Sequence, residues 1–251
     1  MSWMSDTTRP VPSVYGPGTL TGSHAPVMYD AGLRAHMIGV YNYMMLGLAL
    51  SGIVAYLVTN TALGNLFYAG RELTLLGWIA LFVPLGLILI ASFAQPLSPT
   101  AIQGLYWGIT AFQGVGLAAL LKAYTAASVT QVFFITAAGF GALSLWGYTT
   151  MKSLSGWGSF LLMGLIGLIV ASLVNLFLGS STLQFAITVA GLLVFAGLTA
   201  WDTQRIKEEY VAGLAQGEQA LTSQVFGALS LYLNFINLFQ LLLSLFGNRD
   251  E

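Results

Sequence analysis

The sequence predicts an all-α polytopic membrane protein with seven transmembrane helices, and its composition and long charge-free runs carry that prediction. Of its 251 residues, 57% are hydrophobic and 7% are charged, against about 25% charged residues in ordinary soluble domains. Several charge-free runs exceed the roughly 20 residues that a helix needs to cross the hydrocarbon core. Helices are predicted because they satisfy their own backbone in lipid, whereas a β-barrel requires shorter alternating segments.

The N-terminal segment differs in character from the rest of the chain. Residues 1–30 are predicted to form a flexible polar tail, because they are rich in proline and glycine and hold no core of their own. The segment lacks a basic stretch followed by an apolar core and a small-residue cleavage site, so no removable signal peptide is expected. The first span then serves as the targeting signal, and residues 31–251 form one membrane domain.

The first three spans come from two charge-free runs. Met37 to Gly70 has 34 residues, which is enough for one helix and a loop. Leu73 to Leu121 has 49 residues and is interrupted by Gln95-Pro96-Leu97-Ser98-Pro99. Since two prolines fit poorly inside a helix, this run is predicted to form two helices joined by a tight turn.

The remaining four spans come from three further runs. Ala123 to Met151 has 29 residues and holds one helix, and Ser153 to Trp201 has 49 residues and holds two, separated near Gly179. Gln219 to Asn248 has 30 residues and holds the last helix. The predicted spans are therefore about 37–58, 74–93, 101–121, 128–149, 157–178, 183–201 and 222–246.

The distribution of basic residues predicts a cytoplasmic N-terminus. With seven crossings, five basic residues fall on the side of the N-terminus and three on the other side, and the positive-inside rule places the richer side in the cytoplasm. The five are Arg9, Arg34, Lys152, Arg205 and Lys207, and the three are Arg71, Lys122 and Arg249.

The last span carries a polar stripe. At 100° per residue its members fall within roughly a third of the helix circumference, and exposing them to lipid would leave their donors and acceptors unpaired. We therefore expect the other helices to surround this one. The stripe either bonds to neighbouring helices or lines a polar pathway, and its members are Ser230, Asn234, Asn237, Gln240 and Ser244.

Asp202 is an acid placed at the end of a long apolar run. The 49 residues from Ser153 to Trp201 carry no charge, and a charge at the hydrocarbon boundary usually has a partner or a function. If the sixth helix continues past the boundary, Arg205 lies three residues after Asp202, and Glu209 lies four residues after Arg205. Two interpretations stay open: an interfacial ion-pair ladder, or a carboxylate at one mouth of a polar pathway.

Other chemistries have little support in the sequence. The chain has no cysteine and two histidines, which form no metal-ligand spacing. It also lacks the nucleophile-elbow, phosphate-loop and zinc-protease motifs, so no enzymatic activity and no cofactor are expected. The net charge of −1 gives no electrostatic case for nucleic acid. The expected surroundings are a lipid bilayer and other membrane proteins, and the sequence does not define the oligomeric state.

Two C-terminal motifs together closely resemble the Bax inhibitor-1 family, also called the transmembrane BAX inhibitor motif family. They are Phe195-Ala-Gly-Leu-Thr-Ala-Trp-Asp-Thr-Gln-Arg-Ile206 and Ala228-Leu-Ser-Leu-Tyr-Leu-Asn-Phe-Ile-Asn-Leu-Phe239. The segments Asp30-Ala-Gly-Leu-Arg-Ala-His-Met37 and Val40-Tyr-Asn-Tyr-Met44 resemble its bacterial branch, which implies a bacterial inner membrane. The resemblance implies seven helices with the last one central, and a passive, pH-sensitive calcium leak. For some bacterial relatives it implies a role in modulating a membrane-anchored AAA protease.

The chain departs from the family pattern at one position of the site. The resemblance implies a pair of acids, but here Asp202 faces a second position occupied by Asn234. Two close carboxylates titrate as a coupled pair, which an acid and an amide do not. Asp202 and Asn234 together would form a weak calcium site. Two hypotheses follow: a calcium or proton leak through Asp202 and the stripe, or a non-enzymatic modulator of a membrane protease or another membrane complex.

Overall fold

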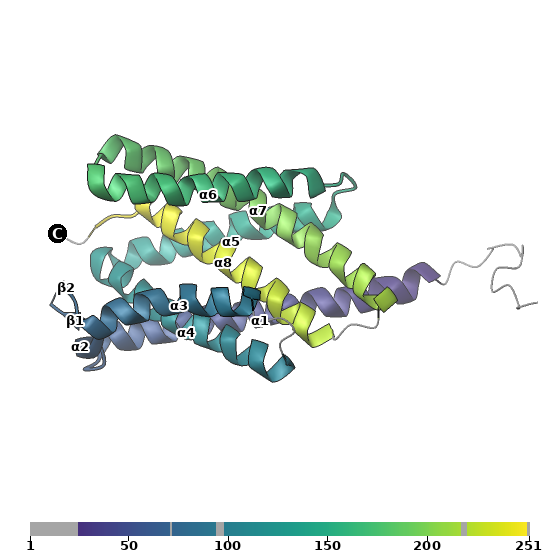
Figure 1. Ribbon diagram of the computed structural model, residues 1–251, viewed down its shortest axis with the longest axis horizontal. Coiled ribbons are helices and arrows are strands. Elements are labelled where there is room, and N and C mark those ends of the chain that lie inside the picture. The colour runs from purple at the N-terminus through teal and green to yellow at the C-terminus, as the bar shows by residue number, and fades with distance from the viewer. Residues whose placement is uncertain (1–24, 71, 94–97, 217–219, 250–251) are drawn as a thin grey trace, which may run out of the picture.

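The structure, a computed structural model, describes residues 25–70, 72–93, 98–216 and 220–249 (Figure 1). Within these ranges the chain is almost entirely helical, and the prediction of an all-α polytopic membrane protein is confirmed at that level. The elements are α1 (Ala25–Asn60), α2 (Gly64–Phe67), β1 (Tyr68–Ala69), β2 (Glu72–Leu73), α3 (Leu75–Phe93), α4 (Pro99–Ala123), α5 (Ala126–Thr149), α6 (Ser155–Leu178), α7 (Ser181–Gln216) and α8 (Ala220–Phe246).

Each of the seven predicted spans falls on a long helix, but the helices are not equally suited to cross a membrane. Within the described residues, 6 helices are long and apolar enough to do so. The remaining long helix is α3, which has 19 residues, and within the residues searched its Leu75–Ala91 part is a shorter apolar helix. Large hydrophobic side chains on the outside of the bundle are exposed, including Leu75 at 79% and Phe177 at 88%. An apolar exterior of this kind is suited to contact with lipid.

Two helices extend beyond their predicted spans. Helix α1 begins at Ala25, so its first residues belong to the segment predicted to be a flexible tail, while residues 1–24 lie outside the described residues. Helix α7 continues to Gln216, as expected for the segment that follows Asp202. The proline-containing break after the second span falls between Phe93 and Pro99, where residues 94–97 also lie outside the described residues.

Local side-chain chemistry sets several helix ends. Ser98 caps α4 by accepting a hydrogen bond from the Ala101 amide, with Pro99 in the first turn, where its missing N–H costs nothing. Thr125 caps α5 in the same way through the Ser128 amide. Gly179 ends α6 with φ of 60°, a left-handed conformation that glycine adopts without strain.

Helix α8 is the most buried of the candidate spans. Half of its most apolar window, 50%, is buried, against 11–39% for the other five. It packs mainly on α1, α4, α5 and α7, whereas α3 packs on α4 and α6 packs on α7. The expectation that the other six helices surround it is therefore not confirmed. Helices α3 and α6 pack on α4 and α7 instead, and in the view of Figure 1 α8 crosses between them.

Helix α8 runs the whole length of the bundle. Its first half contacts the polar extension of α7, and the segment after its last turn is bonded to the junction of α4 and α5. There the Thr125 amide donates to the Asn248 carbonyl over 3.0 Å, and the Asn248 amide donates to the Ser128 hydroxyl over 2.9 Å. The two ends of α8 therefore lie at opposite ends of the molecule (Figure 1).

Candidate functional site

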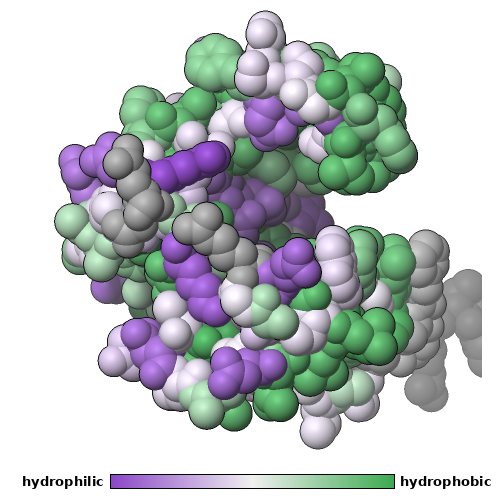
Figure 2. Space-filling view, turned by 90° about the vertical axis from the view of Figure 1, so that its left-hand side faces the viewer, coloured by the Kyte–Doolittle hydropathy of each residue, from purple (hydrophilic) through white to green (hydrophobic). Residues whose placement is uncertain are grey.

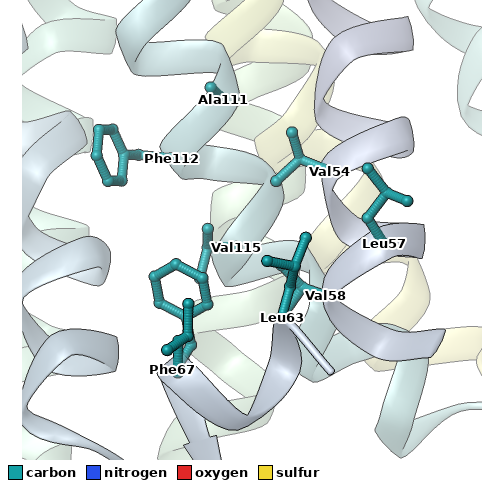
Figure 3. A pocket seen from close by; sticks show the side chains of 9 residues that line it. Val54, Leu57, Val58, Leu63, Phe67, Ala111, Phe112 and Val115 are labelled. Atoms are coloured by element: carbon teal, nitrogen blue, oxygen red, sulfur yellow. The ribbon is translucent and has the colours of Figure 1, made fainter. Parts of the chain in front are cut away.

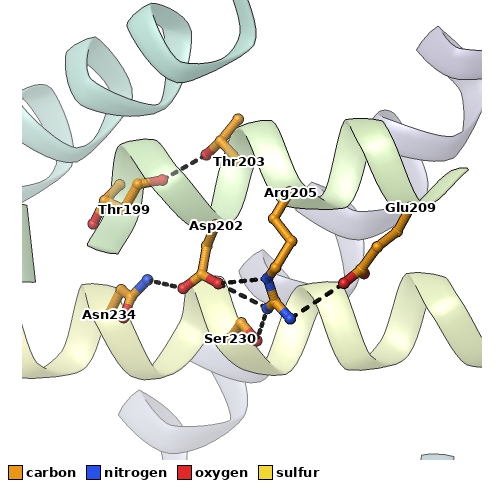
Figure 4. A network of polar contacts seen from close by, with 7 residues as sticks. All are labelled: Thr199, Asp202, Thr203, Arg205, Glu209, Ser230 and Asn234. Atoms are coloured by element: carbon orange, nitrogen blue, oxygen red, sulfur yellow. Dashed lines mark hydrogen bonds and ion pairs between the residues drawn. The ribbon is translucent and has the colours of Figure 1, made fainter. Parts of the chain in front are cut away.

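Asp202 lies at the contact between α7 and α8, with its side chain 8% exposed. One carboxylate oxygen, Oδ2, accepts a hydrogen bond of 2.7 Å from Nδ2 of Asn234 on α8. The other, Oδ1, accepts from Arg205 through Nη2 at 2.7 Å and Nε at 3.1 Å. Figure 4 shows the two donors approaching from opposite sides of the carboxylate. A buried charge needs such partners, since an unpaired one is strongly destabilising.

Arg205 connects this carboxylate to α8 and to the end of α7. Its Nη2 also donates to the Ser230 hydroxyl over 3.1 Å, and its Nη1 donates to Glu209 over 3.3 Å. The guanidinium carbon lies 5.1 Å from the ring centroid of Trp201, within the range of a cation–π contact. The i+3 and i+4 ion pairs expected from the sequence are both formed. They differ in setting, because the Glu209 side chain is 52% exposed.

Three consecutive residues of α7 bond to three different parts of the protein. Asp202 bonds to α8, while the Thr203 hydroxyl lies 2.9 Å from the Ser144 hydroxyl on α5. Gln204 donates to the Lys152 carbonyl over 2.9 Å and accepts from the Leu154 amide over 2.6 Å, both in the α5–α6 connection. Successive helical residues point about 100° apart, so α7 needs neighbours on most of its circumference here.

Close packing of α5 and α6 holds this part of α7 in place. A Cβ atom at Gly147 of α5 would overlap the carbonyl oxygen of Ala200, and one at Gly158 of α6 would overlap the ring of Trp201. Glycine therefore permits a backbone approach that a larger residue would block. The two contacts fix the residues immediately before Asp202.

The predicted polar stripe of α8 divides into two parts. Ser230 and Asn234 belong to the Asp202 network, and Asn234 is buried at 5% exposure. Asn237 and Gln240 are half-buried further along the helix, and Asn237 bonds to the carbonyl of Leu233 on its own helix. Figure 2 views the end of the molecule where α4 meets α5, and it shows a hollow between the helices that contains hydrophilic residues. The stripe leads from the Asp202 network toward that end.

A family model described as "Inhibitor of apoptosis-promoting Bax1" matches residues 33–251. The chain belongs to the Bax inhibitor-1 family. An uncharacterized protein of Caulobacter vibrioides is 48% identical over 93% of the chain and 96% of its own length. The inner membrane protein YbhL of Escherichia coli strain K12 is 42% identical over 90% of the chain and 97% of its own length. The chain therefore matches these relatives over nearly their full lengths.

In this Bax inhibitor-1 family protein, the carboxylate is occupied by protein donors. Both oxygens of Asp202 accept hydrogen bonds, two on Oδ1 from Arg205 and one on Oδ2 from Asn234, so a cation at this carboxylate competes with these donors. No group of three or more histidine, aspartate or glutamate side chains suited to holding a metal occurs among the residues that the structure describes. Asp202 and Asn234 thus bond to each other rather than lying open as a pair of calcium ligands.

Sequence reasoning singled out the acid but not the residues that orient the helix around it. Thr203, Gln204, Ser144 and Tyr41 were not predicted to take part, although the Tyr41 hydroxyl bonds to Ser144 and Ser144 bonds to Thr203. One signal was available: three polar residues in a row at the end of an apolar helix cannot all face the same neighbour. The sequence did not indicate which helix each of them would meet.

Proposed function

We propose that this protein is a passive leak pathway for cations, calcium or protons, and that the Asp202 network closes one mouth of it. The burial of Asp202 carries the proposal. Asp202 is the one carboxylate that is buried among the described side chains. An acid within a membrane protein's spans usually marks an ion or proton route. It lies at one end of the stripe formed by Ser230, Asn234, Asn237 and Gln240.

Three side chains hold the mouth closed: Asp202, Arg205 and Asn234. Arg205 neutralises Asp202, and Asn234 bonds it to α8, so that both donors compete with a passing ion for the carboxylate. Opening requires Arg205 to swing toward Glu209 and solvent, which its 35% exposure permits. Asp202 and the amide oxygen of Asn234 would then offer hard ligands to calcium. A single carboxylate gives weaker affinity than the acid pair expected from the resemblance.

The proposal includes the orientation of the chain. We infer that α3 also crosses the membrane, which brings the number of spans to seven. We further infer that the protein lies in the bacterial inner membrane with its N-terminus in the cytoplasm. Arg34, Lys152, Arg205 and Lys207 would then lie near the cytoplasmic face, in agreement with the positive-inside rule. The location agrees with that of the relative named inner membrane protein YbhL.

The test is flux in proteoliposomes prepared from purified protein. Calcium and proton leak is measured at several pH values for wild type, Asp202→Asn and Arg205→Gln, with empty liposomes as background. We expect Arg205→Gln to leak faster than wild type, because it removes one of the side chains that hold the mouth closed and leaves the acid, and Asp202→Asn to lose the calcium leak. Equal leak in wild type and Asp202→Asn at every pH would exclude this role for the acid.

A second candidate function is modulation of a membrane-anchored AAA protease without catalysis. It is supported by the polar extension of α7, where Glu208, Glu209 and Val211 are exposed beyond the Asp202 network. A protease domain at the membrane surface would contact this extension first. Co-purification of the protease with wild type, and its loss when Glu208 and Val211 are replaced by lysine, would support this role. Normal turnover of protease substrates in a deletion strain would argue against it.

A further inference from the structure

A long groove separates α1 from α5. Both helices rest on α7 and α8, and the space between them is a cavity of about 550 Å³ whose floor includes Phe235 of α8. On α1 its lining runs from Arg34 to Met45, a rise of about 16 Å at 1.5 Å per residue. That length is about half of the roughly 30 Å hydrocarbon core, so the groove matches one leaflet of a bilayer.

The wall of this groove includes two hydroxyl groups, those of Tyr41 and Ser144, but neither can donate a hydrogen bond to an occupant. Thr203 donates to the carbonyl of Thr199 over 2.8 Å. Because its only proton is used there, Ser144 must donate to Thr203, and the Tyr41 hydroxyl must donate to Ser144. Neither wall hydroxyl has a proton left for an occupant. The rest of the middle section is hydrocarbon, including Met37, Met44 and Phe140, which suits an acyl chain.

One end of the groove is cationic. Arg34 lines it and is exposed. Lys207 of α7 reaches the same end, because its Nζ donates to the Tyr148 carbonyl over 3.0 Å and lies 5.5 Å from the centroid of that ring. Tyr148 itself lines the groove. Of the nearby acids on α7, Glu209 pairs with Arg205 and Glu208 is exposed.

We propose that this groove binds one anionic glycerophospholipid of the surrounding bilayer. One acyl chain lies between α1 and α5, and the phosphate lies between Arg34 and Lys207. Basic side chains at the membrane surface attract anionic headgroups, and the groove joins such a pair of cations to a hydrocarbon channel of one-leaflet length. The lipid fills the space beside the hydrogen bond between Tyr41 and Ser144, which joins α1 to α5 directly.

A second cavity lacks the cationic end that distinguishes this groove. It has a volume of about 300 Å³ and lies between α1, α2 and α4, where Val54, Leu57, Phe67 and Phe112 line it (Figure 3). Every side chain in its lining is apolar, so it offers nothing that recognises a headgroup. It serves as an internal reference for unspecific contact with hydrocarbon.

The test is native mass spectrometry of the delipidated full-length protein in detergent, titrated with dioleoyl phosphatidylglycerol or dioleoyl phosphatidylcholine. Wild type should retain phosphatidylglycerol in preference. Arg34→Gln with Lys207→Gln should weaken its binding by about 25-fold, since each of the two cations near a membrane surface contributes about a factor of five. Gly141→Trp should block binding, because Gly141 lines the groove and has open space beyond its Cα.

Gly139→Trp is the matched control. Gly139 lies two residues away on the same helix, is exposed, also has open space beyond its Cα and does not line the groove, so its binding should match that of wild type. Equal binding of both lipids by wild type would overturn the proposal, as would undiminished phosphatidylglycerol binding by Gly141→Trp. Full competition by soluble glycerol 3-phosphate would assign the cations to a free phosphate and would also overturn it.

Discussion

Asn234 donates a 2.7 Å hydrogen bond to Asp202, across the contact between α7 and α8. The amide occupies the position where the family resemblance leads one to expect a second acid. It gives the carboxylate a hydrogen-bond donor without adding charge of its own. A pair of acids could join α7 to α8 by a hydrogen bond only if one of them were protonated. The amide of Asn234 joins the two helices without that requirement.

Replacing Asn234 with Asp should make the stability of the protein depend on pH. Two carboxylates this close resist simultaneous ionisation, so Asn234→Asp should unfold at a progressively lower temperature than wild type as the pH rises from 5 to 8. Thermal unfolding in detergent measures the difference. Asn237→Asp is the control on the same helix, because Asn237 bonds within α8 and is half-buried. An identical pH response in the two variants would contradict the prediction.

Arg205 should contribute far more to stability than Glu209. Arg205→Gln leaves the buried Asp202 with Asn234 as its remaining side-chain donor and should cost about 2 kcal/mol, less than a fully buried pair because Arg205 is partly exposed. Glu209→Gln removes an exposed ion pair and should cost under about 0.5 kcal/mol. Chemical denaturation of both variants checks this, and equal losses would show that the exposed pair matters as much as the buried one.

The close approach of α5 to α7 should depend on Gly147. Gly147→Ala places a methyl group against the Ala200 carbonyl, and overpacking of this kind costs about 1–3 kcal/mol. Gly139→Ala on the same helix meets no atom within 4 Å and should be neutral or slightly stabilising, because alanine favours helix. A melting temperature for Gly147→Ala equal to that of Gly139→Ala would show that the helices separate at little cost.

His36 should be replaceable by an apolar ring without loss of stability. It is 2% exposed, neither ring nitrogen has a hydrogen-bond partner among the side chains that the structure describes, and the ring centroid lies 4.6 Å from that of Tyr210. An unsatisfied buried polar group costs about 1–3 kcal/mol, so His36→Phe should be neutral or stabilising. His36→Ala should destabilise by about 2–4 kcal/mol, because it leaves a cavity. A larger loss in His36→Phe than in His36→Ala would reveal a polar role for the imidazole.

Much of the fold follows from properties that a single sequence contains. Charge-free runs locate helices because the bilayer sets their length, and Pro96 with Pro99 marks the boundary between α3 and α4 since proline disrupts a helix interior. The start of α1 was placed too late. Residues 25–30 include Pro26 and follow a segment rich in proline and glycine, yet α1 runs through them.

The site was predictable where partners lie on one helix and less so where they lie on different helices. The Asp202–Arg205 and Arg205–Glu209 pairs follow from helical spacing alone. The neighbour at Asn234 came from the polar stripe together with the family resemblance. The partners of Thr203 and Gln204 depend on how α5 and the α5–α6 connection pack against α7, which no local pattern contains.

The threefold attachment of Asp202, Thr203 and Gln204 determines which part of the protein is free to move. Rotating or sliding α7 would break the bonds to Ser144, Leu154 and Asn234 together, so α7 is the helix least free to move. Asp202 is then freed by a rotamer change at Arg205 or by displacement of α8. Labels that report motion should therefore be placed on α8 and at Arg205, with α7 as the fixed reference.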